Sequence, residues 1–262
     1  MHSITGLALI SLVVVCIIMF IVWLWATYIS NYSIVDVFWA LNFSVISVIL
    51  LFLGNATDQR KFLTCSLLIC WSLRLGIYLS NRVFSHITEE EGRYKQLRNE
   101  WKTSIKLKFF LFFQSQALSN VYLSIPFFII CSNRKPGISL IEYIGALMWL
   151  ISIIGEGVAD FQLKHFKKNS ENKGKVCDVG LWHYSRHPNY FFQLMLWTSV
   201  LVFALPSQYG WIAVICPLSI GYLIFKVTGI PMTEQQSIRS KGDLYREYQR
   251  STSAFIPWFK HK

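Results

Sequence analysis

The residues best suited to chemistry lie in the stretch Gly180-Leu-Trp-His-Tyr-Ser-Arg-His-Pro-Asn-Tyr190, which runs into an apolar segment. Pro188 suits the first turn of a helix, where a missing N–H has no cost. The free N–H groups there and the positive end of the helix dipole favour an anion, and Arg186 can bind a phosphate through two hydrogen bonds. With His187, Asn189 and Tyr190, these residues form a candidate pyrophosphate site. A capped helix with an arginine and aromatic residues at a membrane edge is an equally good interpretation.

A second candidate group consists of Glu156, Asp160, Lys164 and Lys167. Their spacings of four, four and three residues place them on one helical face. Glu156 lies about one turn inside the expected membrane edge, where a carboxylate is a functional candidate. The carboxylates can accept hydrogen bonds from ribose hydroxyls or a nicotinamide carboxamide, and the lysines can meet phosphates. A self-paired ladder of charges that reaches the membrane surface is the alternative.

The C-terminal segment contains a third group, made of Glu234, Arg239, Tyr245, Tyr248 and Arg250 and followed by Phe255-Ile-Pro257. A polar segment with paired aromatic residues can close over a bound nucleotide, with the adenine stacked on tyrosine or arginine. An amphipathic segment that lies at the membrane surface fits the same pattern.

Polar residues also interrupt the apolar segments, among them Asp36, Arg74, Gln116 and Asn120. A carboxylic acid that stays neutral in an apolar site can donate a hydrogen bond to a substrate carbonyl. Asp36 is therefore a candidate catalytic acid, with Tyr78 and Tyr122 as candidate helpers. A structural pair between Asp36 and Arg74 is the alternative. Gln116 and Asn120, one turn apart, either line a substrate cavity or bridge helices.

The composition indicates the class of protein that must position these groups. Hydrophobic residues make up 53% of the 262 residues and charged residues only 15%, whereas soluble domains carry about 25% charged residues. The charges are bunched between long apolar runs. We therefore expect an all-α, polytopic membrane helix bundle that forms a single membrane domain over residues 1–262.

The net charge of +11 does not predict nucleic-acid binding, because most Lys and Arg residues lie beside apolar runs, where membrane topology explains them. The six cysteines include no Cys-x-x-Cys pair, so neither a metal site nor a disulfide framework is expected. The expected partners are membrane lipids and a hydrophobic small molecule. The pattern indicates no particular oligomeric state.

About 20 apolar residues are needed to cross a membrane. Seven candidate spans meet this length approximately, and Pro126 and Pro217 fall inside two of them and should kink these helices. The first span begins in an apolar run too long for a signal peptide, so we expect it to be retained. The seven spans are 6–29, 34–53, 62–80, 107–131, 138–159, 189–206 and 210–231.

The distribution of basic residues predicts the orientation. Segments 81–106, 160–188 and 232–262, together with Lys108, contain 19 of the 25 Lys and Arg residues. By the positive-inside rule these segments are cytoplasmic. The N-terminus is then outside, the C-terminus is cytoplasmic, and the site opens to the cytoplasm. The expected host membrane is a bacterial inner membrane or the endoplasmic reticulum.

In combination, these motifs resemble the steroid 5α-reductase family, and more closely its bacterial branch of steroid 5α-reductase-like membrane proteins. The resemblance runs over nearly the whole chain. Arg-His-Pro-x-Tyr alone is less specific, because membrane methyltransferases carry it too. The matching segments are Gly180–Tyr190, Gly155–Asp160 with the lysines after it, Tyr245-Arg-Glu-Tyr248 with Phe255-Ile-Pro257, Ser33–Trp39, Trp71–Gly76, Arg93-Tyr94 and Gln116-Ala117.

The resemblance implies a seven-helix bundle in which cytoplasmic loops and inner helix ends hold NADPH. It implies reduction of the C=C bond of a 3-oxo-Δ4 steroid or a similar enone lipid. Asp160 and Asn189 match nucleotide-contacting positions, and Asp36 stands where the family has a Glu that engages the substrate carbonyl. The tyrosine that usually partners this Glu is replaced by Trp71, and Gln193 stands where a Glu is common. The candidate substrate-binding residues are Trp39, Trp71, Gln116 and Asn120.

The leading hypothesis is therefore an NADPH-dependent reductase of an enone lipid. The first alternative is a membrane methyltransferase that uses S-adenosylmethionine to methylate a lipid or an isoprenylcysteine. The second alternative is a non-catalytic sterol-binding protein or transporter, which intramembrane polar residues on several spans would also fit.

Overall fold

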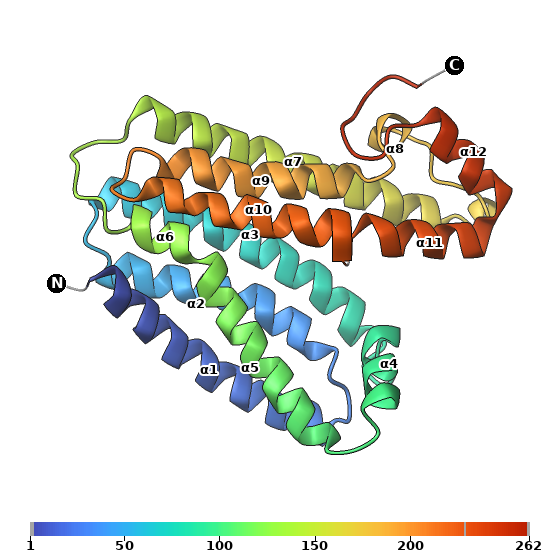
Figure 1. The fold of residues 1–262 in the computed structure, drawn as a ribbon, viewed down its shortest axis with the longest axis horizontal. Coiled ribbons are helices and arrows are strands. Elements are labelled where there is room, and N and C mark those ends of the chain that lie inside the picture. Colours follow the sequence, from blue (N-terminus) through green and yellow to red (C-terminus); the bar gives the residue numbers. More distant parts are fainter. Residues whose placement is uncertain (1–2, 228, 261–262) are drawn as a thin grey trace. The chain divides into compact units, whose positions relative to one another are not determined.

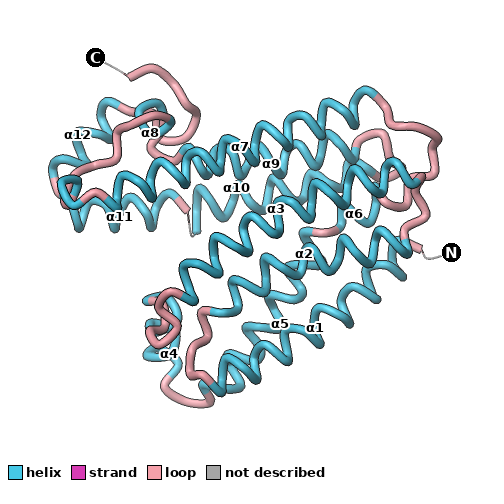
Figure 2. Tube along the Cα trace, turned by 180° about the vertical axis from the view of Figure 1, so that it is seen from behind, coloured by secondary structure: helices cyan, strands magenta, loops and turns pink. Residues whose placement is uncertain are grey.

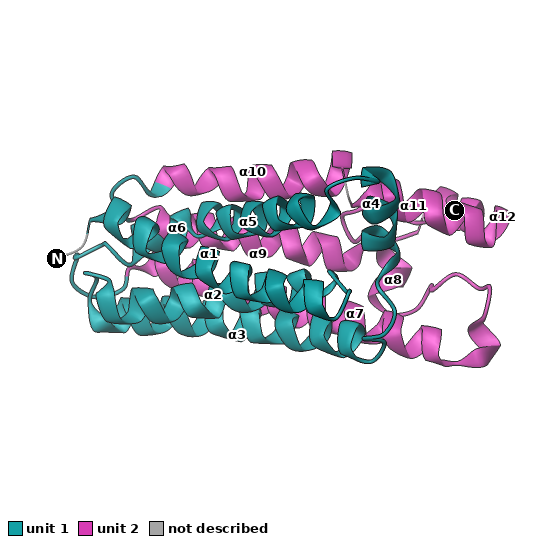
Figure 3. Ribbon diagram, turned by 90° about the horizontal axis from the view of Figure 1, so that it is seen from below, with its two compact units in different colours: residues 1–138, 207–210 teal, residues 139–206, 211–262 magenta. Residues whose placement is uncertain are grey.

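The computed structural model describes residues 3–227 and 229–260, and every regular element in these residues is a helix (Figure 1). The chain forms two compact units, shown in different colours in Figure 3. Unit 1 comprises Met1–Ile138 and Ser207–Gly210, and unit 2 comprises Ser139–Pro206 and Trp211–Lys262.

Unit 1 is built on long apolar helices. Helix α1 lies beside α2 and α5, and α2 lies along α3, as Figures 1 and 2 show. A short polar helix, α4, lies between α3 and α5 in the chain. The bounds are α1 (Ile4–Tyr28), α2 (Ile34–Leu53), α3 (Asp58–Phe84), α4 (Gly92–Trp101), α5 (Ile105–Leu123) and α6 (Ile125–Ile130).

The predicted span 107–131 consists of two helices, α5 and α6, which meet at Ser124. Proline has no N–H, and its ring conflicts with the carbonyl four residues earlier, so Pro126 cannot continue α5. The N–H groups of Phe127 and Phe128 instead bond the carbonyl of Ser124, at 3.0 and 3.1 Å. The interruption expected at this proline is therefore present, and it separates two helices.

Unit 2 is organised around the packing of α7 against α9. At Gly145 of α7 an added Cβ would lie 2.7 Å from the backbone nitrogen of Phe203 in α9, so only glycine allows this close approach. Its elements are α7 (Leu140–Lys168), η1 (Ser170–Asn172), α8 (Leu181–Tyr184), α9 (Pro188–Ala204), α10 (Ile215–Tyr222), η3 (Leu223–Val227), α11 (Ile230–Lys241) and α12 (Asp243–Ser251), with η2 (Gly210–Val214) leading into α10.

A capping box stabilises the N-terminus of α7. The Ser139 N–H donates to the Glu142 carboxylate at 2.7 Å, and the Glu142 N–H donates to the Ser139 hydroxyl at 3.4 Å. These bonds satisfy N–H groups that a helix leaves without internal partners. The capping box explains why α7 begins at Leu140, close to the predicted start of the fifth span at 138.

Five helical segments of the described chain are long and apolar enough to cross a membrane. They correspond to the first, second, third, fifth and seventh predicted spans. The sixth corresponds to α9, which has 17 residues, and the fourth is divided between α5 and α6. The protein is thus a helical membrane protein with five candidate spans, and the count of seven and the orientation stay predictions. The five are Ile4–Tyr28, Ile34–Leu53, Asp58–Phe84, Leu140–Lys168 and Gly210–Lys241.

Arg60, in the first turn of α3, fixes the connection after α6. Its side chain is buried, and its guanidinium donates to the backbone carbonyls of Asn133, at 3.0 Å, of Lys135, at 2.7 Å, and of Gly137. A loop backbone that turns inward needs partners for its carbonyls, and one arginine supplies several donors in a fixed plane.

We predict that Arg60→Ala lowers the free energy of unfolding by about 3 kcal/mol, because it leaves buried carbonyls without donors. The Tm of the detergent-solubilised protein measures this loss. Lys95→Ala is the matched control, because Lys95 is exposed on α4 and exposed substitutions usually change stability by about 0.5 kcal/mol or less. Equal Tm values for the two variants would show that the Arg60 contacts contribute no stability.

Candidate functional site

A cavity of about 140 Å³ lies in unit 2, where residues of α7, α9, α11 and α12 meet. We call it the α9 cavity, because the first turn of α9 forms part of its wall. It includes most of the residues that the sequence predicts to bind a cofactor. The predicted residues that line it are Lys167, Arg186, His187, Asn189, Tyr190, Tyr245 and Tyr248.

The start of α9 is as predicted, with Pro188 in the first turn. The Asn189 side-chain oxygen accepts a hydrogen bond from the N–H of Tyr190 at 3.0 Å, and its amide nitrogen lies 3.5 Å from the Asp160 carboxylate on α7. The rings of His187 and Tyr190 stack, with centroids 5.5 Å apart. Asn189 therefore links α9 to α7 and places the positive end of the α9 dipole beside the cavity.

Two lysines from different helices line the α9 cavity. Lys167 comes from the last turn of α7, and Lys241 is the last residue of α11. Two like charges beside one small cavity, next to a helix N-terminus, create a positive potential that favours an anion. Sequence analysis missed Lys241, although Thr233, Ser237 and Lys241 lie four residues apart and all three line the cavity.

The guanidinium of Arg186 contacts other parts of the chain. Its Nε donates to the Glu234 carboxylate at 2.8 Å, and its Nη1 donates to the carbonyls of Gln249, at 2.9 Å, and Thr252, at 2.7 Å. Only 10% of its side chain is exposed. The guanidinium thus binds the C-terminal part of the chain itself, and a phosphate would have to replace these partners.

Glu234 is the centre of this arrangement, which we call the Arg186 group (Arg186, His187, Glu234 and Gln249). The carboxylate accepts hydrogen bonds from Arg186 and from the Gln249 amide at 2.8 Å, and the His187 ring nitrogen lies 3.2 Å away. A buried charge needs such partners. The Glu234 carboxylate thus contacts the Gly180–Tyr190 motif through Arg186 and His187.

The C-terminal residues pack on the Gly180–Tyr190 motif. The Ser185 hydroxyl donates to the Phe255 carbonyl at 2.8 Å, and the Trp258 N–H donates to the Tyr184 carbonyl at 2.9 Å. The Tyr248 hydroxyl donates to the Trp182 carbonyl. The segment predicted to close over a nucleotide thus covers the motif and forms one wall of the α9 cavity.

The two tyrosines of α12 stay protonated at neutral pH. Burial raises the pKa of Tyr245 to about 12, helped by the negative charge of Glu234. Burial also raises the pKa of Tyr248 well above its ordinary value, and the Asp178 carboxylate adds to the shift. Both phenols therefore keep their protons in the wall of the cavity, and Tyr248 donates its proton to the Trp182 carbonyl.

Gly180 opens the motif with a positive φ of 57°, where an added Cβ would lie 2.2 Å from the Gln162 side-chain nitrogen. The Gln162 side-chain oxygen accepts a hydrogen bond from the Leu181 N–H at 2.9 Å. Only glycine combines this backbone conformation with room for the glutamine. The glycine thus sets the path of the motif beside α7.

The other predicted cofactor residues lie elsewhere in unit 2. Glu156 is buried within α7, whereas Lys164 on α7 and Arg239 on α11 are exposed. Of the predicted charged face of α7, Lys167 lines the cavity, and Asp160 reaches it indirectly through Asn189.

A second polar group lies in unit 1, where the start of α2, the end of α3 and the start of α4 meet. The Tyr94 hydroxyl donates to Asp36 Oδ1 at 2.7 Å, and Arg82 Nη2 lies 3.4 Å from Oδ2. Arg82 also forms a two-point contact with Glu91, at 2.6 and 3.1 Å. We call Asp36, Arg82, Glu91 and Tyr94 the Asp36 group.

The structure therefore joins Asp36 to Tyr94 and Arg82, and not to the Arg74 that the sequence offered as a structural partner. Tyr94 is completely buried. Burial raises the pKa of Tyr94 far above its ordinary value, and the nearby Asp36 carboxylate raises it further. The phenolic proton thus stays on Tyr94 and is shared with the carboxylate.

An ion pair between Arg98 and Glu90 lies next to the Asp36 group in the chain. Arg98 contacts the Glu90 carboxylate at 2.9 and 3.0 Å and lies over the Tyr32 ring, 5.1 Å from its centroid. Glu90 also accepts the Tyr32 N–H at 2.9 Å. These partners were not predicted, because the residues of each pair are nine (Arg82 and Glu91) or eight (Glu90 and Arg98) positions apart, farther than the three or four at which side chains of one helix pair directly.

The other catalytic and substrate candidates occupy separate places in unit 1. Tyr78 on α3 and Tyr122 on α5 are 41% and 43% exposed. The Trp39 indole N–H donates to the Ser119 hydroxyl at 2.8 Å, and the Asn120 amide donates to the Trp39 carbonyl at 2.9 Å.

Asn120 also accepts a hydrogen bond from Asn42 at 3.1 Å, and it therefore bridges α2 and α5. Trp71 is buried and packs edge-to-face against Phe43 at 5.2 Å. The side chain of Gln116 is half-buried on α5. Of the two interpretations given to Asn120, the structure favours the bridge between helices.

Fold and sites define the class of the chain: a helical membrane protein whose polar groups gather at helix ends. A family model described as a protein of unknown function (DUF1295) matches residues 22–252, so the chain belongs to the DUF1295 family. Neither the curated proteins nor the solved structures include a match to the chain.

We predict that Arg186→Lys loosens the C-terminal segment, because an ammonium group cannot reproduce the planar contacts to Glu234 and two carbonyls. Hydrogen exchange followed by mass spectrometry should show faster exchange in residues 252–258. The Tm should fall by an amount equivalent to about 3 kcal/mol.

Arg250→Lys is the matched control for Arg186→Lys. Arg250 is exposed on α12, and exposed substitutions usually change stability by about 0.5 kcal/mol or less. Unchanged exchange in residues 252–258 of the Arg186→Lys protein would mean that other contacts hold this segment.

Proposed function

We propose that this protein is an NADPH-dependent membrane reductase, which transfers a hydride to the C=C bond of an enone lipid. A 3-oxo-Δ4 steroid is the first candidate substrate. The proposal rests on one observation above all: Lys167 and Lys241 line a cavity beside the N-terminus of α9. Seven spans and an opening to the cytoplasm are part of the proposal.

The α9 cavity fits one phosphorylated part of a dinucleotide. Small-molecule sites usually enclose about 300–1,000 Å³, and this cavity holds about 140 Å³. A phosphate is the part that two lysines and a helix N-terminus would select. Several cations near one site also suit the additional 2′-phosphate that distinguishes NADPH from NADH.

Different residues of the chain would bind the phosphate and hold the walls of the cavity. Lys167 and Lys241 would bind phosphate oxygens, and Asn189 holds the start of α9 in place through Asp160. The Arg186 group fixes the C-terminal wall of the cavity. NADPH would supply the hydride to the β-carbon and leave as NADP+, and water would supply the proton to the α-carbon. The protein would bind and orient the cofactor.

Asp36 remains the proposed donor to the substrate carbonyl, a role that requires the protonated carboxylic acid in place of the carboxylate that Tyr94 and Arg82 contact in the structure. As hydride adds to an enone, negative charge builds on the carbonyl oxygen, and one positioned donor lowers the barrier by about 3–4 kcal/mol. The Tyr94 hydroxyl on Asp36 Oδ1 provides a phenol beside this carboxyl group. The resemblance to steroid 5α-reductases supports this role, since Asp36 stands where the family has a Glu.

A methyltransferase is the second candidate function, because membrane methyltransferases share the Arg186-His-Pro-Asn-Tyr190 pattern. S-adenosylmethionine carries no phosphate, and its sulfonium is cationic. A cavity lined by two lysines therefore favours the dinucleotide. A non-catalytic sterol-binding protein would have no use for this cationic cavity.

We predict that Lys167→Gln and Lys241→Gln each raise the Kd for NADPH about tenfold, equivalent to about 1.4 kcal/mol. Each removes one charge from the phosphate site. Calorimetric titration of the purified protein with NADPH and, separately, with S-adenosylmethionine measures this change. Lys168→Gln is the matched control, because Lys168 is exposed next to Lys167 but does not line the cavity.

The titration also separates the candidate functions. Binding of S-adenosylmethionine without binding of NADPH would replace the reductase with a methyltransferase. Failure of both ligands to bind, together with absence of turnover, would leave the sterol-binding interpretation.

We predict that Asp36→Asn lowers kcat about 100-fold or more at saturating NADPH, as loss of an oxyanion-stabilising donor does. The assay follows NADPH oxidation against a panel of Δ4-3-ketosteroids and acyclic enones. Asp58→Asn, at an exposed position in the first turn of α3, is the control and should keep full activity. Full kcat in Asp36→Asn, with unchanged Kd for NADPH, would remove Asp36 from the chemistry.

A further inference from the structure

A cavity of about 490 Å³ lies in unit 1 where α1 begins and where α2 and α6 end. We call it the α1 cavity. It is at the opposite end of these helices from the Asp36 group, which forms where α2 begins. Neither the proposed reductase nor any motif of the sequence uses it.

The position of the α1 cavity corresponds to the boundary between apolar and polar surroundings. Ile4 and Ile129, from the first turn of α1 and the last turn of α6, form its apolar part. Asn55 follows the end of α2, and Tyr209 belongs to the loop after α9. In a membrane, the ends of apolar helices lie at the depth of the lipid headgroups, where tyrosine is also enriched.

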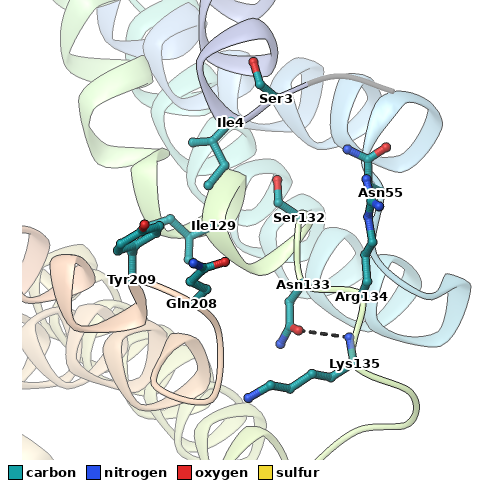
Figure 4. Close-up of a pocket in the computed structure, with 10 residues that line it drawn as sticks. All are labelled: Ser3, Ile4, Asn55, Ile129, Ser132, Asn133, Arg134, Lys135, Gln208 and Tyr209. Carbon is teal, nitrogen blue, oxygen red and sulfur yellow. Dashed lines mark hydrogen bonds between the residues drawn. The ribbon is translucent and has the colours of Figure 1, made fainter.

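The polar part of the α1 cavity is cationic. Arg134 and Lys135 line it together with Ser132 and Gln208, and none of the ten described residues in its lining is acidic. Figure 4 shows Asn55 and Arg134 along one side of the hollow and Gln208 and Tyr209 on the other. A ligand enclosed by these groups meets positive charge and hydrogen-bond donors on opposite walls.

Contacts of the Asn133 side chain and of the loop backbone hold the walls of the cavity. The Asn133 amide donates to the Ser207 hydroxyl at 3.1 Å. The Asn133 side-chain oxygen accepts the Lys135 N–H at 3.1 Å, as Figure 4 shows. Arg60 binds the carbonyls of Asn133 and Lys135. The cavity is therefore pre-formed, as small-molecule sites usually are.

We propose that the α1 cavity binds the phosphodiester headgroup of an anionic membrane phospholipid. The volume of the cavity, about 490 Å³, lies within the range of about 300–1,000 Å³ that small-molecule sites usually enclose. Arg134 and Lys135 provide the charge that attracts an anionic lipid. Ser132, Asn55 and Gln208 provide hydrogen-bonding groups for the phosphate and for the hydroxyls of the headgroup.

The test is lipid retention by the full chain, purified in detergent and incubated with phosphatidylglycerol or with phosphatidylcholine. Native mass spectrometry counts the lipids that stay bound. The wild-type protein should retain phosphatidylglycerol in preference to phosphatidylcholine. The double variant Arg134→Gln, Lys135→Gln should lower this retention about tenfold or more, since both cations are lost.

Lys61→Gln is the matched control, because Lys61 lies in the first turn of α3, pairs with Asp58 and is not part of the cavity lining. It should retain phosphatidylglycerol like the wild-type protein. The Tm of the double variant without lipid, measured beside that of the wild type, separates loss of binding from loss of folding.

Two results would overturn the proposal. The first is equal phosphatidylglycerol retention by the double variant and the wild-type protein. The second is a Tm increase with inorganic phosphate that the double variant lacks, together with no preference for phosphatidylglycerol, which would assign the cavity to a free anion. Either result is independent of NADPH binding at the α9 cavity.

Discussion

An arginine that is removed from water needs partners for its charge and for its several donors, and this requirement shapes the connections in both units. Arg60 is buried and binds the backbone of residues 133–137. Arg186 binds Glu234 and the backbone around Gln249 and Thr252. The planar guanidinium fits several acceptors at fixed angles. Loop carbonyls that helix packing leaves without donors are satisfied in this way, and the helix ends are held where the loops require them.

The same requirement separates residues that build the site from residues that can bind a ligand. In the Gly180–Tyr190 motif the arginine contacts the chain's own C-terminal segment. Lys167 and Lys241 also line the α9 cavity, and the described contacts of unit 2 give neither lysine an ion-pair partner. A lysine carries a compact charge on a flexible stem, which can follow a bound phosphate. An Arg-His-Pro motif can therefore be maintained for architecture while the specificity of the site comes from residues outside it.

Prediction from sequence was most accurate where the physics is local. The helix starts at Ile34 and Pro188 and the interruption near Pro126 follow from apolar runs and from the chemistry of proline. The helical face predicted for Glu156, Asp160, Lys164 and Lys167 is also local. Helix α7 continues to Lys168, nine residues beyond the end of its predicted membrane span at 159, because a helix that is already formed adds further residues readily. This extension is what brings Lys167 to the α9 cavity.

The amino-acid sequence alone determined the membrane class, the positions of the apolar helices and the motif at which α9 begins, since these depend on residues close together in the chain. Only the tertiary structure decided which groups meet: Tyr94 donates to Asp36 from 58 residues away, and Arg186 binds Glu234 across 48 residues. Such pairs depend on how each helix is rotated and on the path of each loop. Neither quantity is encoded in the spacing of residues along one helix, so Tyr94 and Lys241 became visible as site residues only in the folded chain.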